Sequence, residues 1–244
     1  MSEKEGETEP EEAPAVSRED ELNNLEDIFE HIYEDVPGHV AKMNSRKERE
    51  TMGLNVPSLT YGEILFRPFA EVMYKLYDYG FPKPDPEART HKFVDLGSGS
   101  GRPVFAAALC HPFDNCVGYE ILEGLSEVAN NLKNHWENEV KATAPEYAQS
   151  TEFEFVHGDL LEMSWSDADV VFMNSTCFDD ELLAKIQPMI DQMQKGTFVI
   201  TTTKPLKSYL WQVIEKNRFE EAWGAATVFI HTKIRDNDAP EEGA

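Results

Sequence analysis

The sequence predicts an α/β fold in which helices cover both faces of a mainly parallel sheet. From residue 91 onward, short apolar segments typical of strands alternate with segments typical of helices, as in a parallel sheet covered on both sides. A glycine-rich loop, residues 97–101, follows the first of these strands and precedes a helix. Acidic residues then follow successive strands, at the sheet edge where ligands bind in open α/β folds.

The first 90 residues are predicted to form an acidic tail and a helical region. Residues 1–20 combine Glu, Pro, Ala and Ser with almost nothing to bury, which is typical of disorder. In the helical N-terminal region, residues 21–90, apolar residues at helical spacing predict helices over 22–33 and 64–76. Between them, residues 39–60 fit a helix followed by a loop. The region ends in the clearest internal boundary, formed by Gly80, Pro82, Pro84 and Pro86.

Residues 91–235 are predicted to form the main domain, and residues 236–244 a second acidic, disordered tail. Short apolar runs predict strands at 93–96, 116–120, 152–156, 169–173, 197–203 and 225–234. Longer amphipathic segments predict helices at 102–110, 122–142, 180–194 and 207–217.

The composition restricts the classes of partner. The chain carries 46 acidic and 22 basic residues, a net charge of −24, and no cluster of Lys and Arg. Autonomous binding to nucleic acid is therefore not expected, whereas a basic protein is a suitable electrostatic partner. No apolar run approaches the ~20 residues of a membrane span, and the acidic N-terminus differs from targeting peptides. Three cysteines predict neither a disulfide framework nor a metal site, and we expect an intracellular protein, nuclear or cytoplasmic.

The glycine loop and the acids around it predict an S-adenosylmethionine site. Gly97 and Gly99 allow a ligand to approach the backbone, but their spacing to Gly101 differs from the dinucleotide pattern. Asp95, two residues before the loop, would repel a pyrophosphate and attract the amino group of S-adenosylmethionine. Glu120 ends the second strand, where an acid can accept the ribose hydroxyls. Asp159 follows the third strand and can accept from the adenine amino group.

Each of these features also has a simpler interpretation. A glycine loop alone can be a structural turn, and one acid among 46 is more often solvated or capping. Three acids at the ends of three successive strands are a less accidental set. They predict a class I methyltransferase, a Rossmann-like fold with a mainly parallel seven-stranded sheet.

Several motifs, in one order and spacing, carry a closer resemblance. The sequence resembles the disruptor-of-telomeric-silencing family of non-SET histone lysine methyltransferases, from about residue 59 to residue 234. The most specific part is Tyr61-Gly62-Glu63, which most class I methyltransferases lack. The other matching segments are Phe93 to Gly99, Gly158-Asp159-Leu160, Val171 to Asn174, Thr203-Lys204-Pro205, Trp223 and Phe229 to Thr232.

The resemblance implies a role for each matching residue. The cofactor would be held by Tyr61, Glu63, Asp95, Gly97, Gly99, Arg102, Glu120, Asp159 and Asn174, with Glu63 reaching back over its amino-acid end. Asn174 would contact the cofactor or position the incoming amine, while Phe178 and Trp223 would wall a lysine channel. Alternatively, both aromatic residues belong to the core and Asn174 caps a helix.

Departures from the family pattern fall on the substrate side. Ser175, Thr176 and Cys177 replace an asparagine and an aromatic, Val228-Phe229 replaces a tyrosine pair, and Arg102 replaces a common glutamine. Methyl transfer to the lysine of a basic protein, with a histone implied by the resemblance, is the leading hypothesis. Methylation of a non-histone protein or a small molecule is the second. A catalytically silent module that binds S-adenosylmethionine or basic proteins is the third.

Overall fold

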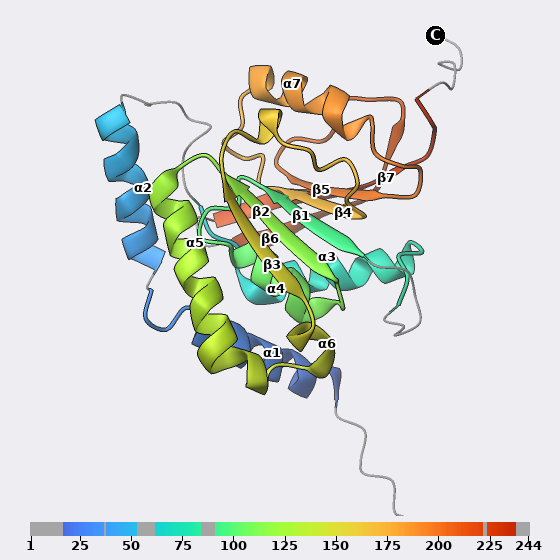
Figure 1. Cartoon of the computed structure of the whole chain (residues 1–244). Helices are drawn as coiled ribbons and strands as arrows, with labels where there is room; N and C mark the ends of the chain where they lie inside the picture. The colour runs from blue at the N-terminus through green and yellow to red at the C-terminus, as the bar shows by residue number, and fades with distance from the viewer. Residues whose placement is uncertain (1–16, 37, 53–61, 84–90, 222–223, 238–244) are drawn as a thin grey trace, which may run out of the picture.

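A seven-stranded sheet organises the molecule (Figure 1). The computed structural model describes residues 17–36, 38–52, 62–83, 91–221 and 224–237. The strands lie in the order β3-β2-β1-β4-β5-β7-β6. Strands β1 to β5 are parallel, and β7 runs antiparallel to both β5 and β6. The bounds are β1 Lys92–Leu96, β2 Asn115–Glu120, β3 Glu152–His157, β4 Val170–Met173, β5 Phe198–Thr202, β6 Trp211–Glu221 and β7 Gly224–Lys233. The predicted fold class is confirmed.

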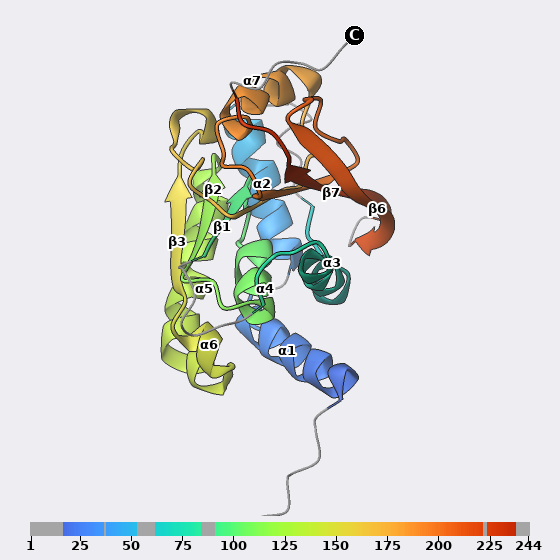
Figure 2. The same cartoon turned by 90° about the vertical axis from the view of Figure 1, so that its right-hand side faces the viewer.

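Helices cover both faces because successive residues of each strand point to opposite sides. Phe93 of β1 packs with apolar residues of α1, α3, α4 and α5, whereas Val94 and Leu96 pack with α7. Figures 1 and 2 show α7 on one side of the sheet and α1, α3 and α4 on the other. These helices are α1 Arg18–Ile32, α3 Phe66–Asp78, α4 Arg102–Cys110, α5 Glu123–His135 and α7 Asp180–Ile190.

The N-terminal helices pack onto this α/β unit. Helix α1 begins at Arg18, where the Ser17 side chain accepts a hydrogen bond from the Asp20 amide. Residues 18–20, which the sequence assigns to the acidic tail, are therefore the first turn of α1. Helix α2, Gly38–Met52, lies beside α5 (Figure 1). In the described part of the chain, no helix has the length and apolar character needed to cross a bilayer.

The helix predicted at 122–142 is one helical run with a change of winding. Helix α5 ends at His135 and is followed by a π turn, Trp136–Val140, and a 3₁₀ turn, Lys141–Thr143. Shorter turns follow at α6, Glu146–Gln149, and at Leu160–Glu162.

The prediction of a helix at 207–217 is wrong, because strand β6 begins at Trp211. Leu210, Trp211 and Ile214 have helical spacing, but the register with β7 shifts between Val213 and Glu215. An extra residue of this kind interrupts the alternation by which a strand is recognised.

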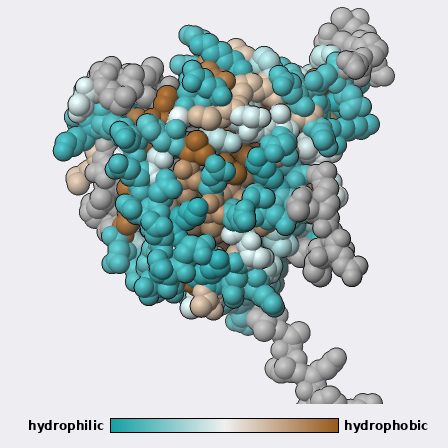
Figure 3. Space-filling view, in the orientation of Figure 1, coloured by the Kyte–Doolittle hydropathy of each residue, from teal (hydrophilic) through white to brown (hydrophobic). Residues whose placement is uncertain are grey.

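Hydrophilic side chains cover most of the face in Figure 3, with hydrophobic ones near its centre.

Candidate functional site

The glycine loop between β1 and α4 is held by the end of β2. The amides of Gly97 and Ser98 both donate to the Tyr119 carbonyl, at 2.9 and 3.0 Å. The Gly99 amide donates to Glu120 Oε2 at 2.8 Å. The backbone of the loop has positive φ angles of 84° at Gly97 and 56° at Gly99. Glycine adopts such angles readily, whereas residues with a side chain disfavour them. Three successive amides are thus used inside the protein, which is unlike a loop that binds pyrophosphate through its N–H groups.

Asp95, in β1 just before this loop, has one buried carboxylate oxygen without a hydrogen-bond partner in the described part of the chain. Its side chain is 1% exposed, and Oδ2 has no hydrogen-bond partner among the described residues. Burial, and secondarily the charge of Glu120, raise the pKa of the Asp95 carboxyl well above its usual range. Because a buried polar atom normally has a partner, this oxygen marks a place for a cationic or hydrogen-bonding group. The amino group of S-adenosylmethionine fits that requirement.

Glu120 joins the loop to the start of α5. Its Oε1 accepts from the Leu122 amide at 2.9 Å, while Oε2 accepts from Gly99. Burial raises the pKa of the Glu120 carboxyl, and the backbone donors oppose that shift. Each carboxylate oxygen has a second lone pair, so the residue can still accept a ribose hydroxyl. Asp159, half-buried after β3, accepts from the Leu161 amide at 2.9 Å and also keeps acceptor capacity.

Asn174 connects three segments at the end of β4. Thr202 Oγ1 donates to Asn174 Oδ1 at 2.7 Å, and Asn174 Nδ2 donates to the Gly62 carbonyl at 3.5 Å. The cap of the following helix, α7, is Asp179, whose Oδ1 accepts from the Leu182 amide. Asn174 is therefore not the helix cap. Its contact with the Gly62 carbonyl places Gly62, and the adjacent Glu63, near the end of the sheet.

Phe178 lies directly over the glycine loop. Its side chain is 7% exposed, and a Cβ built on Gly97 would stand 3.3 Å from Phe178 Cζ. Lys204 holds this segment, since its Nζ donates to the Phe178 carbonyl at 2.8 Å and pairs with Asp180 at 3.0 Å. The hydrogen bond and charge of Lys204 lower the pKa of the Asp180 carboxyl. The sequence marks Lys204 as part of a motif, but its role becomes clear only in the structure.

Arg102 makes its contacts on the side of α1. Its guanidinium carbon lies 4.6 Å and 4.4 Å from the ring centres of Phe29 and Tyr33, and Nη2 pairs with Glu30 Oε1 at 3.0 Å. These contacts pack α1 on α4 through Arg102, and the cofactor contact suggested by the sequence stays a prediction.

Two predicted site residues, Tyr61 and Trp223, lie outside the described residues. Conversely, Glu48 of α2 was not predicted. Its carboxylate accepts from the amides of Glu123 and Gly124, at 2.8 and 2.9 Å, and so caps the N-terminus of α5. A single acid within a helical pattern gives no signal of such a long-range cap.

A cavity of about 510 Å³ adjoins the Lys204 side of the site. It lies between α7 and the segment that follows β5. Met173, at the end of β4, and Lys204 both line it, together with apolar residues that include Leu183, Ile186 and Leu206.

Comparisons with known sequences show a strong family relationship. The family described as "Histone methylation protein DOT1" matches residues 55–233. The H3 lysine-79 specific histone-lysine N-methyltransferase of Debaryomyces hansenii is 29% identical over 183 residues, covering 72% of this chain and 14% of that protein. The protein of the same name from Caenorhabditis elegans is 28% identical over 116 residues, covering 45% of this chain and 12% of that protein. The matched part is thus a small fraction of these relatives' length.

Among solved structures, an RNA methyltransferase from Salinibacter ruber in complex with S-adenosyl-L-homocysteine is similar to this chain. Its TM-score is 0.50 and its sequence identity 26%, and the match covers 72% of this chain and 95% of that one. The similarity supports the class I methyltransferase fold that the sequence predicts.

Proposed function

Because the chain belongs to the histone methylation protein DOT1 family, we propose that it is an S-adenosylmethionine-dependent protein-lysine N-methyltransferase acting on a histone. The observation that carries the proposal is the buried Asp95 Oδ2, which has no hydrogen-bond partner among the described residues and belongs to the strand before a glycine loop whose first amides are already bonded. The names of the relatives make lysine 79 of histone H3 the first acceptor to test. A histone substrate would place the protein in the nucleus.

The cofactor side of the site rests on four acids. Asp95 would accept from the amino group, Glu120 from the ribose and Asp159 from the adenine. Glu63 follows Gly62, which Asn174 holds at the end of β4, and would close over the amino-acid end. When bound, S-adenosylmethionine would supply a methyl group carried by a sulfonium, and in-line attack of a neutral amine on this methyl carbon would release S-adenosylhomocysteine as the neutral leaving group.

The substrate side must hold a deprotonated lysine. In water the pKa of a lysine side chain is about 10.4, so the ammonium form must be disfavoured near neutral pH. An apolar wall that includes Phe178, with Trp223 as a further candidate, would do so by desolvation. Asn174, fixed by Thr202, would orient the amine or the cofactor. Positioning of this kind can contribute on the order of 7–11 kcal/mol to a two-reactant step.

The test uses the purified chain with methyl-labelled S-adenosylmethionine and three acceptors in parallel: core histones, intact nucleosomes and a cell lysate. Asp95→Asn serves as the blank, because it removes the charge and keeps the shape. Asp167→Asn is the matched control, since Asp167 is an exposed acid paired with Lys92 at the far end of β1. Mass spectrometry of the labelled protein identifies the acceptor residue.

Label on a histone lysine that is lost in Asp95→Asn and kept in Asp167→Asn supports the proposal. Label confined to non-histone proteins keeps the chemistry and rejects the histone substrate. Cofactor binding without label on any acceptor rejects the enzyme and leaves a binding module.

A further inference from the structure

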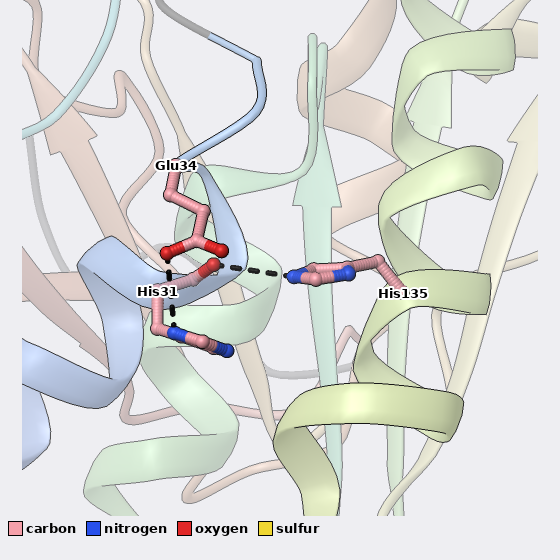
Figure 4. Close-up of side chains that lie close together, drawn as sticks. All are labelled: His31, Glu34 and His135. Carbon is pink, nitrogen blue, oxygen red and sulfur yellow. Dashed lines mark hydrogen bonds and ion pairs between the residues drawn. The ribbon is translucent and has the colours of Figure 1, made fainter.

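Two histidines and a glutamate meet where α1 ends beside α5 (Figure 4). His31 Nδ1 lies 3.3 Å from Glu34 Oε2, and His135 Nε2 lies 3.3 Å from the His31 carbonyl oxygen. The two imidazole rings are stacked with centroids 5.7 Å apart. One potential ligand atom from each of the three side chains lies within 4.8 Å of the other two.

The donor set suits a borderline transition metal. Two imidazole nitrogens and one carboxylate oxygen are ligands that Zn²⁺ accepts, whereas Ca²⁺ and Mg²⁺ prefer all-oxygen sites. In a tetrahedral site with bonds of about 2.0–2.1 Å, ligand atoms stand ~3.4 Å apart. The present separations are therefore within reach of small side-chain rotations. Since His31 and Glu34 are 44% and 54% exposed, a metal can enter and water can complete the coordination.

The backbone around the cluster also favours a cation. His31 lies in the last turn of α1, where the exposed carbonyls give the helix end a partial negative charge. His135 is the last residue of α5, and the π turn Trp136–Val140 begins immediately after it. Such π turns are rare within helical runs and are frequent at functional sites.

We propose that His31, Glu34 and His135 form a Zn²⁺ site that links the N-terminal helix α1 to the C-terminal end of α5. The sequence alone does not reveal it, because the ligands come from positions about a hundred residues apart and match no metal motif. The site is separate from the glycine loop and does not depend on the proposed methyl transfer.

The test is a titration of the full chain with Zn²⁺. Isothermal titration calorimetry measures binding, and thermal unfolding measures the change in melting temperature. Co²⁺ as a second probe reports coordination geometry through its visible absorption. The variants are His135→Gln and Glu34→Gln. The matched control is His157→Gln, because His157 is also exposed and also lies against a backbone carbonyl, that of Ile121. Circular dichroism without metal checks that each variant is folded.

We expect one Zn²⁺ per chain and a melting temperature that rises with metal, as ligand linkage requires. Loss of a direct ligand should weaken binding by more than the ~10–100-fold typical of outer-shell changes, while His157→Gln should bind normally. Equal affinity in all variants would place the metal elsewhere and overturn the proposal. Absence of both heat and a melting shift would overturn it as well.

Discussion

The Asp95 carboxylate destabilises the free protein but would bind the cofactor's amino group in the proposed complex. Its buried carboxyl has a raised pKa, so the folded state disfavours the charged form. As pH rises above the unfolded value near 3.9, the unfolded chain ionises more readily than the folded one, and this group lowers stability. The same charge would be the counterion of a bound amino group.

Asp95→Asn should therefore change stability and affinity in opposite directions. We expect the free energy of unfolding of the free protein at pH 7 to be unchanged or higher, because an unpaired buried charge is removed. Affinity for S-adenosylmethionine should fall at least tenfold, about 1.4 kcal/mol. Urea unfolding and calorimetric titration measure the two effects. A destabilised variant with unchanged affinity would contradict the assigned role.

Two buried histidines should make the fold sensitive to acid. Burial lowers the pKa of His111 to about 3 and that of His231 to about 4. His231 Nε2 accepts from the Leu206 amide, and its Nδ1 faces the Val199 carbonyl, so the neutral ring bridges three segments. His111 contacts the Tyr77 hydroxyl at 2.7 Å and His91 at 3.3 Å.

Because both folded pKa values lie below the unfolded value near 6.5, stability is full above that pH and falls below it. Between pH 7.5 and 5.5 each histidine should cost about 1.4 kcal/mol, measured by urea unfolding at several pH values. His231→Gln should remove about half of this pH dependence. A flat profile over this range would rule out neutral buried rings.

At the residue scale, the sequence predicted where the acids lie in the fold, and their roles toward a cofactor stay predictions. Their positions were predictable because Asp95 lies near the end of the first predicted strand and Glu120 ends the second. The contacts of Arg102 with Phe29 and Tyr33 were not, since they join residues about seventy positions apart. The hydrogen bonds of Asn174 with Thr202 and Gly62 likewise needed coordinates.

At the element scale, strong periodicity predicted correctly and a bulged edge strand did not. The parallel strands have short apolar runs, most of them separated by helices, so their positions along the chain were predictable. Strand β6 contacts only β7 within the sheet, and its bulge imitates helical spacing over Leu210, Trp211 and Ile214. Sequence patterning cannot separate these cases, because the choice between them depends on pairing with β7.

The docking of α1 onto α4 should depend on Arg102. Arg102→Ala removes a stacked, largely buried guanidinium and its stem, and we expect a loss of about 1–2 kcal/mol in the free energy of unfolding. The matched control is Arg46→Ala, which breaks an exposed pair with Glu50 on α2 and should cost at most about 0.5 kcal/mol. Chemical denaturation compares the two. Equal effects would mean that the stacking on α1 contributes little.

At the scale of the whole molecule, the net charge of −24 favours association with a basic partner. A basic protein would be attracted over a distance set by the ionic strength. The Debye length shortens from about 10 Å at 0.1 M salt to about 3 Å at 1 M. Salt should therefore slow the proposed reaction mainly by weakening the association of the enzyme with its protein substrate.

With a histone as acceptor, KM should rise several-fold over this range of salt, while kcat at saturating histone stays nearly constant, because the chemical step is local. Initial rates of label transfer at several histone and salt concentrations measure both constants. A fall in kcat with a constant KM would instead indicate that salt acts on the folded enzyme.

The bonds between the glycine loop and the end of β2 have a consequence for how the cofactor is recognised. Since the amides of Gly97, Ser98 and Gly99 are satisfied within the protein, the loop holds its shape without a ligand. The entropic cost of ordering the loop is then met during folding and not during binding. Cofactor binding would then carry no further entropic cost for ordering the backbone of this loop.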